Sequence, residues 1–156
     1  STSSSVAAGG GMSSDETLKN AIYFAANRAT HTDGKLSLLY IVDPAIDAQW
    51  ARIENLIEQE ATSEAKKICR AWAQKIKKRF NIESEIIIKI GDRAEELLKL
   101  VKEDANIRFL VLASSANNEN PGPLITALTG KKIKDLSIPI VIVPGALSEK
   151  EIDLIA

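Results

Sequence analysis

The sequence has little of several residue types, and each scarcity excludes a class of protein. Cys69 is the only cysteine among 156 residues, so no intrachain disulfide can form, which suits the cytoplasm. No apolar run approaches the roughly 18 residues of a membrane span, and Val6–Ala8 is too short for the apolar core of a signal peptide. The net charge of −1 argues against nucleic-acid binding, which needs an excess of Lys and Arg. We therefore expect a cytoplasmic protein that binds neither nucleic acid nor membranes.

Residues that commonly carry catalysis are also scarce. His31, the only histidine, follows a predicted helix and has no candidate nucleophile near it, so the helix dipole explains its position better than a role as general base. Cys69 falls on the apolar stripe of a long predicted helix, which favours a buried hydrophobic residue over a redox thiol. No paired carboxylates or metal-ligand spacing stand out in the sequence. We therefore expect a protein that is not an enzyme.

One basic cluster departs from the even charge balance. The stretch 75–79 contains four cations and closes a predicted helix. Cations are favoured at a helix C-terminus by the helix dipole, so a solvated helix end is the preferred interpretation. A patch for an acidic partner is the alternative.

Helical and extended segments alternate along the chain. Apolar residues recur at helical spacing or form short runs that are typical of buried strands. The predicted elements are a helix over 14–29, a strand over 35–42, a long helix through 53–76, a strand over 85–90 and a helix over 92–102 capped by Asp92. This alternation predicts an α/β fold with a doubly wound, mostly parallel sheet and helices on both faces. With 45% hydrophobic residues, the chain is long enough for one domain with a substantial core.

The stretch 107–145 carries the strongest functional signal. Two apolar runs, 109–113 and 140–143, flank a polar loop over 114–120 and a predicted helix. Ligands of parallel sheets bind outside the carboxyl ends of the strands, where loops meet helix N-termini. Ser114, Ser115 and Asn117 could therefore bind a small anion, with Lys131 supplying charge. The alternative is that serine and asparagine occur in this loop because they suit turns.

An ordered set of segments resembles the universal stress protein family over about 13–145. Its C-terminal half corresponds to the strand 110–113, the loop 114–120, the helix 124–136 with Gly130, and the strand Ile138–Val143. The segment 91–96 looks like the family's Gly-Asp-Pro-Ala-Glu-Glu, and 38–44 looks like its second strand with the trailing Val-Asp-Pro. The resemblance implies a five-stranded sheet and a stress-response or regulatory function. It also implies that Val42 and Asp43 lie near a bound adenine.

The nucleotide motif of this family is degenerate in the chain. Nucleotide-binding members have two glycines separated by two residues and, after nine more residues, a third glycine followed by Ser or Thr. These positions correspond to Ala113, Ala116, Gly130 and Lys131, and the intervening loop is longer than the family's. A methyl group at the first two positions restricts positive φ and blocks close approach of the backbone to phosphate. The resemblance is therefore to a bacterial variant subgroup with a degenerate ATP-binding motif.

These features lead to two functional expectations. The first is a non-catalytic, cytoplasmic regulatory protein of universal stress type that has no certain cofactor. The alternative is an ATP-binding switch, or a slow ATPase, that uses a non-standard phosphate loop. A receiver-like or flavodoxin-like protein is a third interpretation, but the acidic cluster of receivers is missing after the first strand.

The N-terminus departs most from the family. The first strand of the family would fall on 5–12, where Gly9, Gly10 and Gly11 lose backbone entropy on ordering and bring no side chains to pack. We expect residues 1–12 to be a flexible or atypical segment, with a weak strand over 4–8 if the sheet is intact. The universal-stress-protein-like domain then covers 13–146, and 147–156 is a tail.

The last strand predicts the assembly. In the family it lies at a sheet edge and pairs with its copy in a second subunit, and here the apolar segment Ile138–Val143 offers such an edge. We therefore expect a homodimer through Ile138–Val143. The tail, with Ile152 and Ile155 three residues apart, could form a helical turn across this interface. The alternative is a monomer whose edge is covered by the tail.

Overall fold

The structure is a computed structural model that describes residues 4–10, 15–42, 54–113, 126, 128–143 and 147–156. Its centre is a five-stranded sheet with the order β3-β2-β1-β4-β5, in which all neighbouring strands are parallel. The strands are β1 (Ser4–Gly10), β2 (Lys35–Val42), β3 (Ser84–Ile90), β4 (Ile107–Ala113) and β5 (Ile140–Val143). The predicted doubly wound parallel sheet is confirmed.

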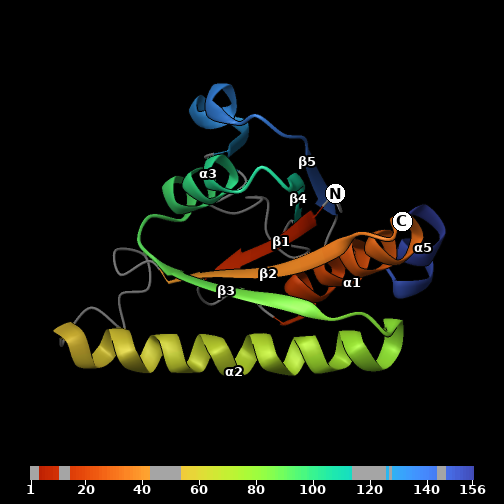
Figure 1. Ribbon diagram of the computed structural model, residues 1–156, viewed down its shortest axis with the longest axis horizontal. Helices are drawn as coiled ribbons and strands as arrows, with labels where there is room; N and C mark the ends of the chain where they lie inside the picture. Colours follow the sequence, from red (N-terminus) through yellow and green to blue (C-terminus); the bar gives the residue numbers. More distant parts are fainter. Residues whose placement is uncertain (1–3, 11–14, 43–53, 114–125, 127, 144–146) are drawn as a thin grey trace.

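Helices cover both faces of the sheet (Figure 1). The helices are α1 (Asp15–Thr32), α2 (Glu54–Phe80), α3 (Arg93–Glu103) and the C-terminal α5 (Glu149–Ile155). Successive residues of β2 point to opposite faces, as a strand requires. Leu36 and Leu38 pack with α1 and α2, whereas Leu39 and Ile41 pack with α3. None of the described helices combines the length and the apolar composition needed to cross a membrane.

The first strand corrects one expectation. Ser4–Gly10 forms β1 and pairs with β2 on one side and with β4 on the other, so these residues are not a flexible leader. The strand is atypical in composition, with two glycines at its end. Residues 4–7 pair with both neighbours, whereas Gly9 and Gly10 pair with β2 alone, and this backbone pairing offsets part of the entropy that glycine loses on ordering. The conditional expectation of a strand in this segment is therefore the correct one.

Most element boundaries agree with the sequence pattern, and β2 agrees residue for residue. Asp92 caps α3 as predicted, and its Oδ1 accepts a hydrogen bond from the backbone N–H of Glu95 at 2.9 Å. The predicted helix over 124–136 is wrong beyond Thr129. There the chain turns at Gly130 and continues as a short 3₁₀ helix, η2 (Lys131–Asp135).

The last strand is shorter than expected. β5 begins at Ile140 rather than Ile138. Pro139 has no N–H to donate to a neighbouring strand, although its carbonyl oxygen accepts a hydrogen bond from Leu110 N–H at 3.0 Å. The strand pairs with β4 alone within the chain and therefore occupies one edge of the sheet.

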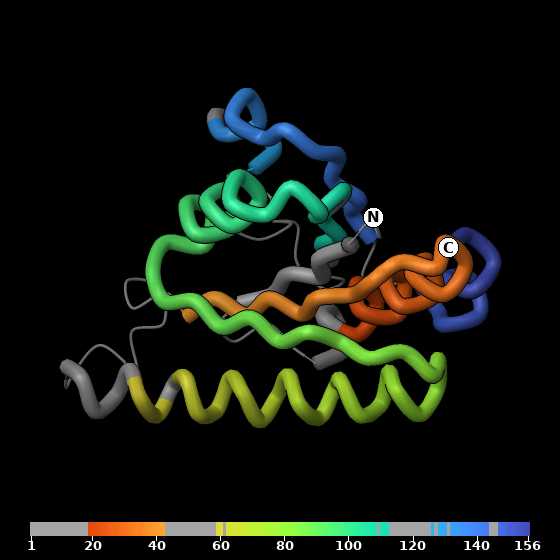
Figure 2. Tube along the Cα trace, in the orientation of Figure 1, coloured from red at the N-terminus to blue at the C-terminus, as the bar shows by residue number. Residues whose placement is uncertain are grey.

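The tail folds back onto its own chain. Residues Glu149–Ile155 form α5, which packs against α1 (Figure 2). Ser148 and Glu151 form a capping box at its N-terminus: the Ser148 hydroxyl accepts from Glu151 N–H, and a Glu151 carboxylate oxygen accepts from Ser148 N–H. Ile152 is fully buried, whereas Ile155 is 60% exposed. The tail thus contributes Ile152 to the core cluster that also contains α1 residues and Val143 of β5, and its packing across a subunit interface stays a prediction.

Candidate functional site

The topology identifies one edge of the sheet as the candidate site. All five strands run in the same direction, so their carboxyl ends meet at one edge. The strand order reverses between β1 and β4, because β1 is followed along the chain by β2 on one side while β4 and β5 lie on the other. Ligands of open α/β sheets bind outside the strand ends at such a reversal. The segments that follow β1 and β4, residues 11–14 and 114–125, lie outside the described residues.

Val42 is the predicted adenine contact that the structure describes best. It is the last residue of β2 and is 3% exposed. Its carbonyl oxygen accepts a hydrogen bond from Gly91 N–H at 2.9 Å, and a carbonyl oxygen has a second lone pair for another donor. Asp43, Ser114, Ser115 and Asn117 lie outside the described residues.

Ala113 ends β4, and its backbone is paired in the sheet with Val143 of β5. It therefore stands at the predicted end of the strand, next to the loop that the family uses for phosphate. Regular strand conformation is open to any residue other than proline. The structure thus does not require glycine at this position for the fold itself.

Gly130 stands where one helical segment ends and the 3₁₀ helix η2 begins. Its N–H donates to the carbonyl oxygen of Thr126 at 3.1 Å, and its own carbonyl oxygen accepts from Ile133 N–H at 3.3 Å. Its φ is −93°, so the left-handed freedom of glycine is not used here. Lys131 follows as the first residue of η2. The backbone N–H that the family motif would offer to phosphate is thus already used within the chain.

The turn between β3 and α3 borders Val42 and has one strict requirement. Gly91 has φ +148°, in a region that L side chains rarely adopt. A Cβ built on Gly91 would lie 2.9 Å from Oε1 of Glu96. The backbone conformation therefore favours glycine at this position, and a side chain there would also require Glu96 to shift.

Arg93 is a further candidate for the site that the sequence analysis did not name. It is the first residue of α3 and is 7% exposed, and it is the one buried residue with a formal charge among those described. It occupies the position of proline in the Gly-Asp-Pro-Ala-Glu-Glu segment that 91–96 resembles. A guanidinium is the side chain best suited to phosphate recognition. The replacement of proline by a cation was the signal that could have identified it.

Two other candidates are inert. Cys69 is 5% exposed in α2, and burial raises the pKa of its thiol to about 11, so it remains protonated near neutral pH. His31 lies in the last turn of α1, where its Nδ1 is 2.9 Å from the backbone oxygen of Ala156. Within the described residues, no group of three or more His, Cys, Asp and Glu side chains could hold a metal ion.

Comparisons with known proteins agree with the architecture. The Universal stress protein family matches residues 10–144. The structure resembles the universal stress protein UspA from Lactobacillus plantarum, with a TM-score of 0.68 and 19% identity over 90% of this chain and 97% of that chain. It also resembles a universal stress protein from Arabidopsis thaliana with AMP bound, with a TM-score of 0.57 and 14% identity over 91% of each chain. No curated protein matches the chain.

A third similar structure is a universal stress protein in complex with cAMP. Its TM-score is 0.59, and its 17% identity extends over 94% of this chain and 100% of that chain. Identities this low show a shared fold and do not show which ligand this chain binds.

Proposed function

The chain belongs to the universal stress protein family, and from that premise we propose that it is a non-catalytic, cytoplasmic stress-response or regulatory protein whose nucleotide site is degenerate. The observation that carries this proposal is the hydrogen bond from Gly130 N–H to Thr126. A phosphate loop works by pointing unpaired backbone N–H groups at the anion. Here the N–H of the one glycine of the motif that remains is already bonded within the chain.

The other motif positions support the same proposal. Ala113 and Ala116 replace two glycines, and Lys131 replaces the hydroxyl residue that would hold phosphate. A lysine can attract phosphate by charge, but it lacks the short, fixed geometry of Ser or Thr next to the backbone. The loss of three features of one motif weakens phosphate binding more than the loss of any one.

The alternative is an adenine-nucleotide switch or slow ATPase. Val42 favours it, since its carbonyl oxygen retains a lone pair at the edge where the family contacts adenine. Arg93 favours it too, as a buried cation beside that edge. Relatives of the same fold with bound AMP and cAMP provide the precedent. In this alternative the adenine half of the site survives and a different set of groups takes the phosphates.

Calorimetric titration with ATP and with AMP separates the two proposals. A degenerate site should bind ATP with a dissociation constant above about 100 μM, or less than about 5.5 kcal/mol of binding free energy. ATP should also bind no more tightly than AMP, because the extra phosphates gain no contacts. Low-micromolar binding of ATP, at least about tenfold tighter than AMP, would establish the alternative.

If ATP binds tightly, a pair of variants tests whether Lys131 binds its phosphates. Lys131→Ala should weaken ATP binding at least about tenfold, as expected for loss of a charged phosphate contact. The control is Lys134→Ala, which removes an exposed cation from the same 3₁₀ helix. Equal affinities for the two variants would exclude Lys131 as a phosphate ligand.

We propose that the protein forms a homodimer through β5. This strand is the sheet edge next to β4, and its Ile142 is 40% exposed. Pairing with the same strand of a second copy would satisfy its free backbone groups and bury Ile142. Val141 is partly buried against the α1 side of the core, so Ile142→Lys is the cleaner test. Light scattering should show a dimer for the unmodified protein and a monomer for Ile142→Lys; an unmodified protein that is monomeric at about 50 μM, well above the micromolar Kd range, would refute the proposal.

A further inference from the structure

The helix α2 carries an unusual concentration of positive charge. Residues 66–80 of this helix contain seven Lys and Arg residues, and no Asp or Glu occurs between Ala65 and Ile82. These cations are Lys66, Lys67, Arg70, Lys75, Lys77, Lys78 and Arg79. The whole chain has a net charge of −1, so this helix stands out against a nearly neutral protein.

The folded structure sorts these cations onto one face. The inner stripe of α2 consists of the buried residues Ala65, Cys69, Trp72 and Ile76, at spacings of three and four. The outward side carries five exposed cations, which we call the basic face: Lys66, Lys67, Arg70, Lys77 and Lys78. Figure 1 shows α2 lying along the sheet as the outermost helix of its layer. At about 1.5 Å per residue the basic face is about 18 Å long.

Partners are unevenly distributed among the cations of α2. At its C-terminal end, Arg79 pairs with Glu149 and Asp153, and Lys77 pairs with Glu83. Among the described residues, no carboxylate forms an ion pair with Lys66, Lys67, Arg70 or Lys78. Lys66, Lys67 and Arg70 are neighbouring like charges that repel one another, so a bound anionic group would relieve a cost that the isolated chain carries.

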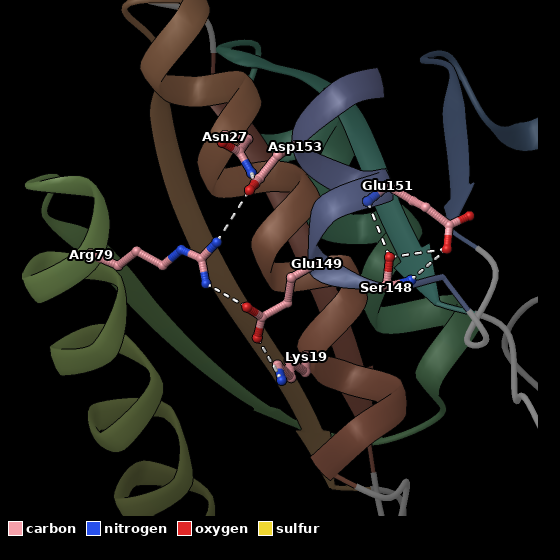
Figure 3. Close-up of polar contacts among 7 residues, drawn as sticks. All are labelled: Lys19, Asn27, Arg79, Ser148, Glu149, Glu151 and Asp153. Atoms are coloured by element: carbon pink, nitrogen blue, oxygen red, sulfur yellow. Dashed lines mark hydrogen bonds and ion pairs between the residues drawn. The ribbon is translucent and has the colours of Figure 1, made fainter.

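One cation of α2 already binds two carboxylates within the chain. Glu149 and Asp153 are four residues apart on α5, and both pair with the guanidinium of Arg79, at 2.9 Å and 3.4 Å (Figure 3). Two carboxylates at this spacing lie on one side of a helix. On the basic face, Lys66 and Arg70 have the same spacing of four residues.

We propose that the basic face of α2 is a docking surface for an acidic segment of another protein. The segment would carry Asp or Glu residues at helical spacing over about 18 Å, which is about three turns of helix. Its carboxylates would pair with Lys66, Arg70 and Lys78 much as Glu149 and Asp153 pair with Arg79. This surface lies on α2 and does not depend on the nucleotide site.

Two other polyanions fit the surface less well. Glu60 and Glu64 are exposed and directly precede the basic face on the same helix, so a long duplex with evenly spaced phosphates would run onto like charge. An anionic membrane would leave the face without an anchor, because exposed Gln74 and Ala71 stand between the cations where a membrane-binding helix has large apolar residues. A short acidic segment meets neither obstacle.

The test is binding of a fluorescein-labelled peptide of twelve glutamates to the full chain, followed by anisotropy. The triple variant Lys66→Gln/Arg70→Gln/Lys78→Gln should lose at least about tenfold in affinity at low salt. The matched control is Lys99→Gln/Lys102→Gln/Lys134→Gln, which removes three exposed cations from α3 and η2 and gives the same net charge. The control should stay within about twofold of the unmodified protein. Binding should weaken for all three proteins as salt rises.

Several outcomes would overturn the proposal. Equal losses in the two triple variants would show that net charge alone governs binding. Failure of the unmodified chain to bind the peptide at low salt would refute the proposed docking surface. Tighter binding of a short DNA duplex, or of vesicles containing phosphatidylserine, would assign the basic face to nucleic acid or to lipid instead.

Discussion

The two faces of the sheet are built differently. On the face covered by α3, the core residues that the structure describes are all aliphatic: Leu39, Ile41, Leu97, Leu110 and Leu112 belong to one cluster. On the face covered by α1 and α2, the core adds aromatic rings, and a polar network joins its rim to the C-terminal helix α5. The first face is held mainly by apolar burial, and the second by apolar burial together with directional contacts.

The rim of the second face explains where α5 docks. Arg79 lies 4.8 Å from the ring centre of Tyr23 and pairs with Glu149 and Asp153. Glu149 also pairs with Lys19 of α1 at 2.7 Å, and Asn27 donates a hydrogen bond to Asp153 at 2.8 Å. Each of these contacts is partly exposed and weak alone. Together they fix the orientation of a seven-residue helix whose one buried residue is Ile152.

The largest expected effect is on the α3 face. Leu97 is fully buried in the middle of α3, so Leu97→Ala should lower the free energy of unfolding by about 2–5 kcal/mol through lost apolar transfer and the cavity left behind. Urea denaturation followed by circular dichroism measures it. Lys99→Ala on the exposed side of α3 is the control and should change stability by less than about 0.5 kcal/mol. A loss below about 1 kcal/mol for Leu97→Ala would contradict an apolar-packed face.

The matching change on the other face is Ile152→Ala. Ile152 is equally buried, but α5 is short and terminal, so it can detach without unfolding the sheet. We expect a loss of about 1–3 kcal/mol in docking of α5 and a smaller change in global stability than for Leu97→Ala. Hydrogen exchange should show faster exchange confined to α5 and the α1 residues beneath it. Uniformly faster exchange throughout the sheet would show that α5 is part of the cooperative unit.

This difference also separates what the sequence could predict from what it could not. The apolar pattern predicted β2, because buried positions differ from exposed ones in residue type and spacing, and the capping residue Asp92 predicted the start of α3. It also identified Cys69 as a core residue. It could not assign a partner to the tail, since Ile152 and the carboxylates of α5 fit any apolar groove with cations beside it. Only the folded chain brings Arg79, Lys19 and Asn27 together around that helix.

The sequence was also a poor guide at β1 and at Gly130, which lie beside the candidate site. The glycines suggested at most a weak strand over 4–8, yet β1 extends over Ser4–Gly10 and lies at the centre of the sheet between β2 and β4. Long-range pairing of this kind overrides local propensity. Likewise the sequence placed Gly130 inside a helix, whereas the structure ends the helix there and begins η2. A glycine that marks a helix end and a glycine that binds phosphate look alike in a sequence.

A smaller effect is expected where the carboxyl edge of the sheet meets α3. Gly91→Ala should cost about 1–3 kcal/mol, because φ +148° strains an alanine and its Cβ meets Glu96. The double variant Gly91→Ala/Glu96→Ala removes the contact but keeps the backbone strain. If the double variant regains most of the lost stability in urea denaturation, the contact dominates; if it regains nothing, the backbone conformation does. A single variant as stable as the unmodified protein would contradict the positive φ.

The smallest expected effect concerns the charged rim of the α1 and α2 face. Hydrogen bonds from Lys19 and Arg79 hold the pKa of Glu149 below its usual value of 4.5. A carboxyl whose folded-state pKa is lowered contributes stability that is present above its unfolded pKa and is lost as the pH falls through its folded pKa. The contribution should therefore be complete near neutral pH and should decline progressively as the pH falls below about 4.5, the unfolded-state pKa, towards the lower folded-state pKa. Because the Glu149 side chain is 41% exposed, solvent screening keeps this contribution to the free energy of unfolding below about 1 kcal/mol. Glu149→Gln should lower stability by that amount at neutral pH, and the difference from the unmodified protein should be smaller at about pH 3. Glu103→Gln, an exposed change at the end of α3 with no ion pair among the described residues, is the control and should show no such convergence. Urea denaturation of the three proteins at both pH values measures the difference. Equal stability of Glu149→Gln and the unmodified protein at neutral pH would show that the charge of Glu149 does not stabilise the docking of α5, and would leave Ile152 and the contacts of Asp153 to hold this helix.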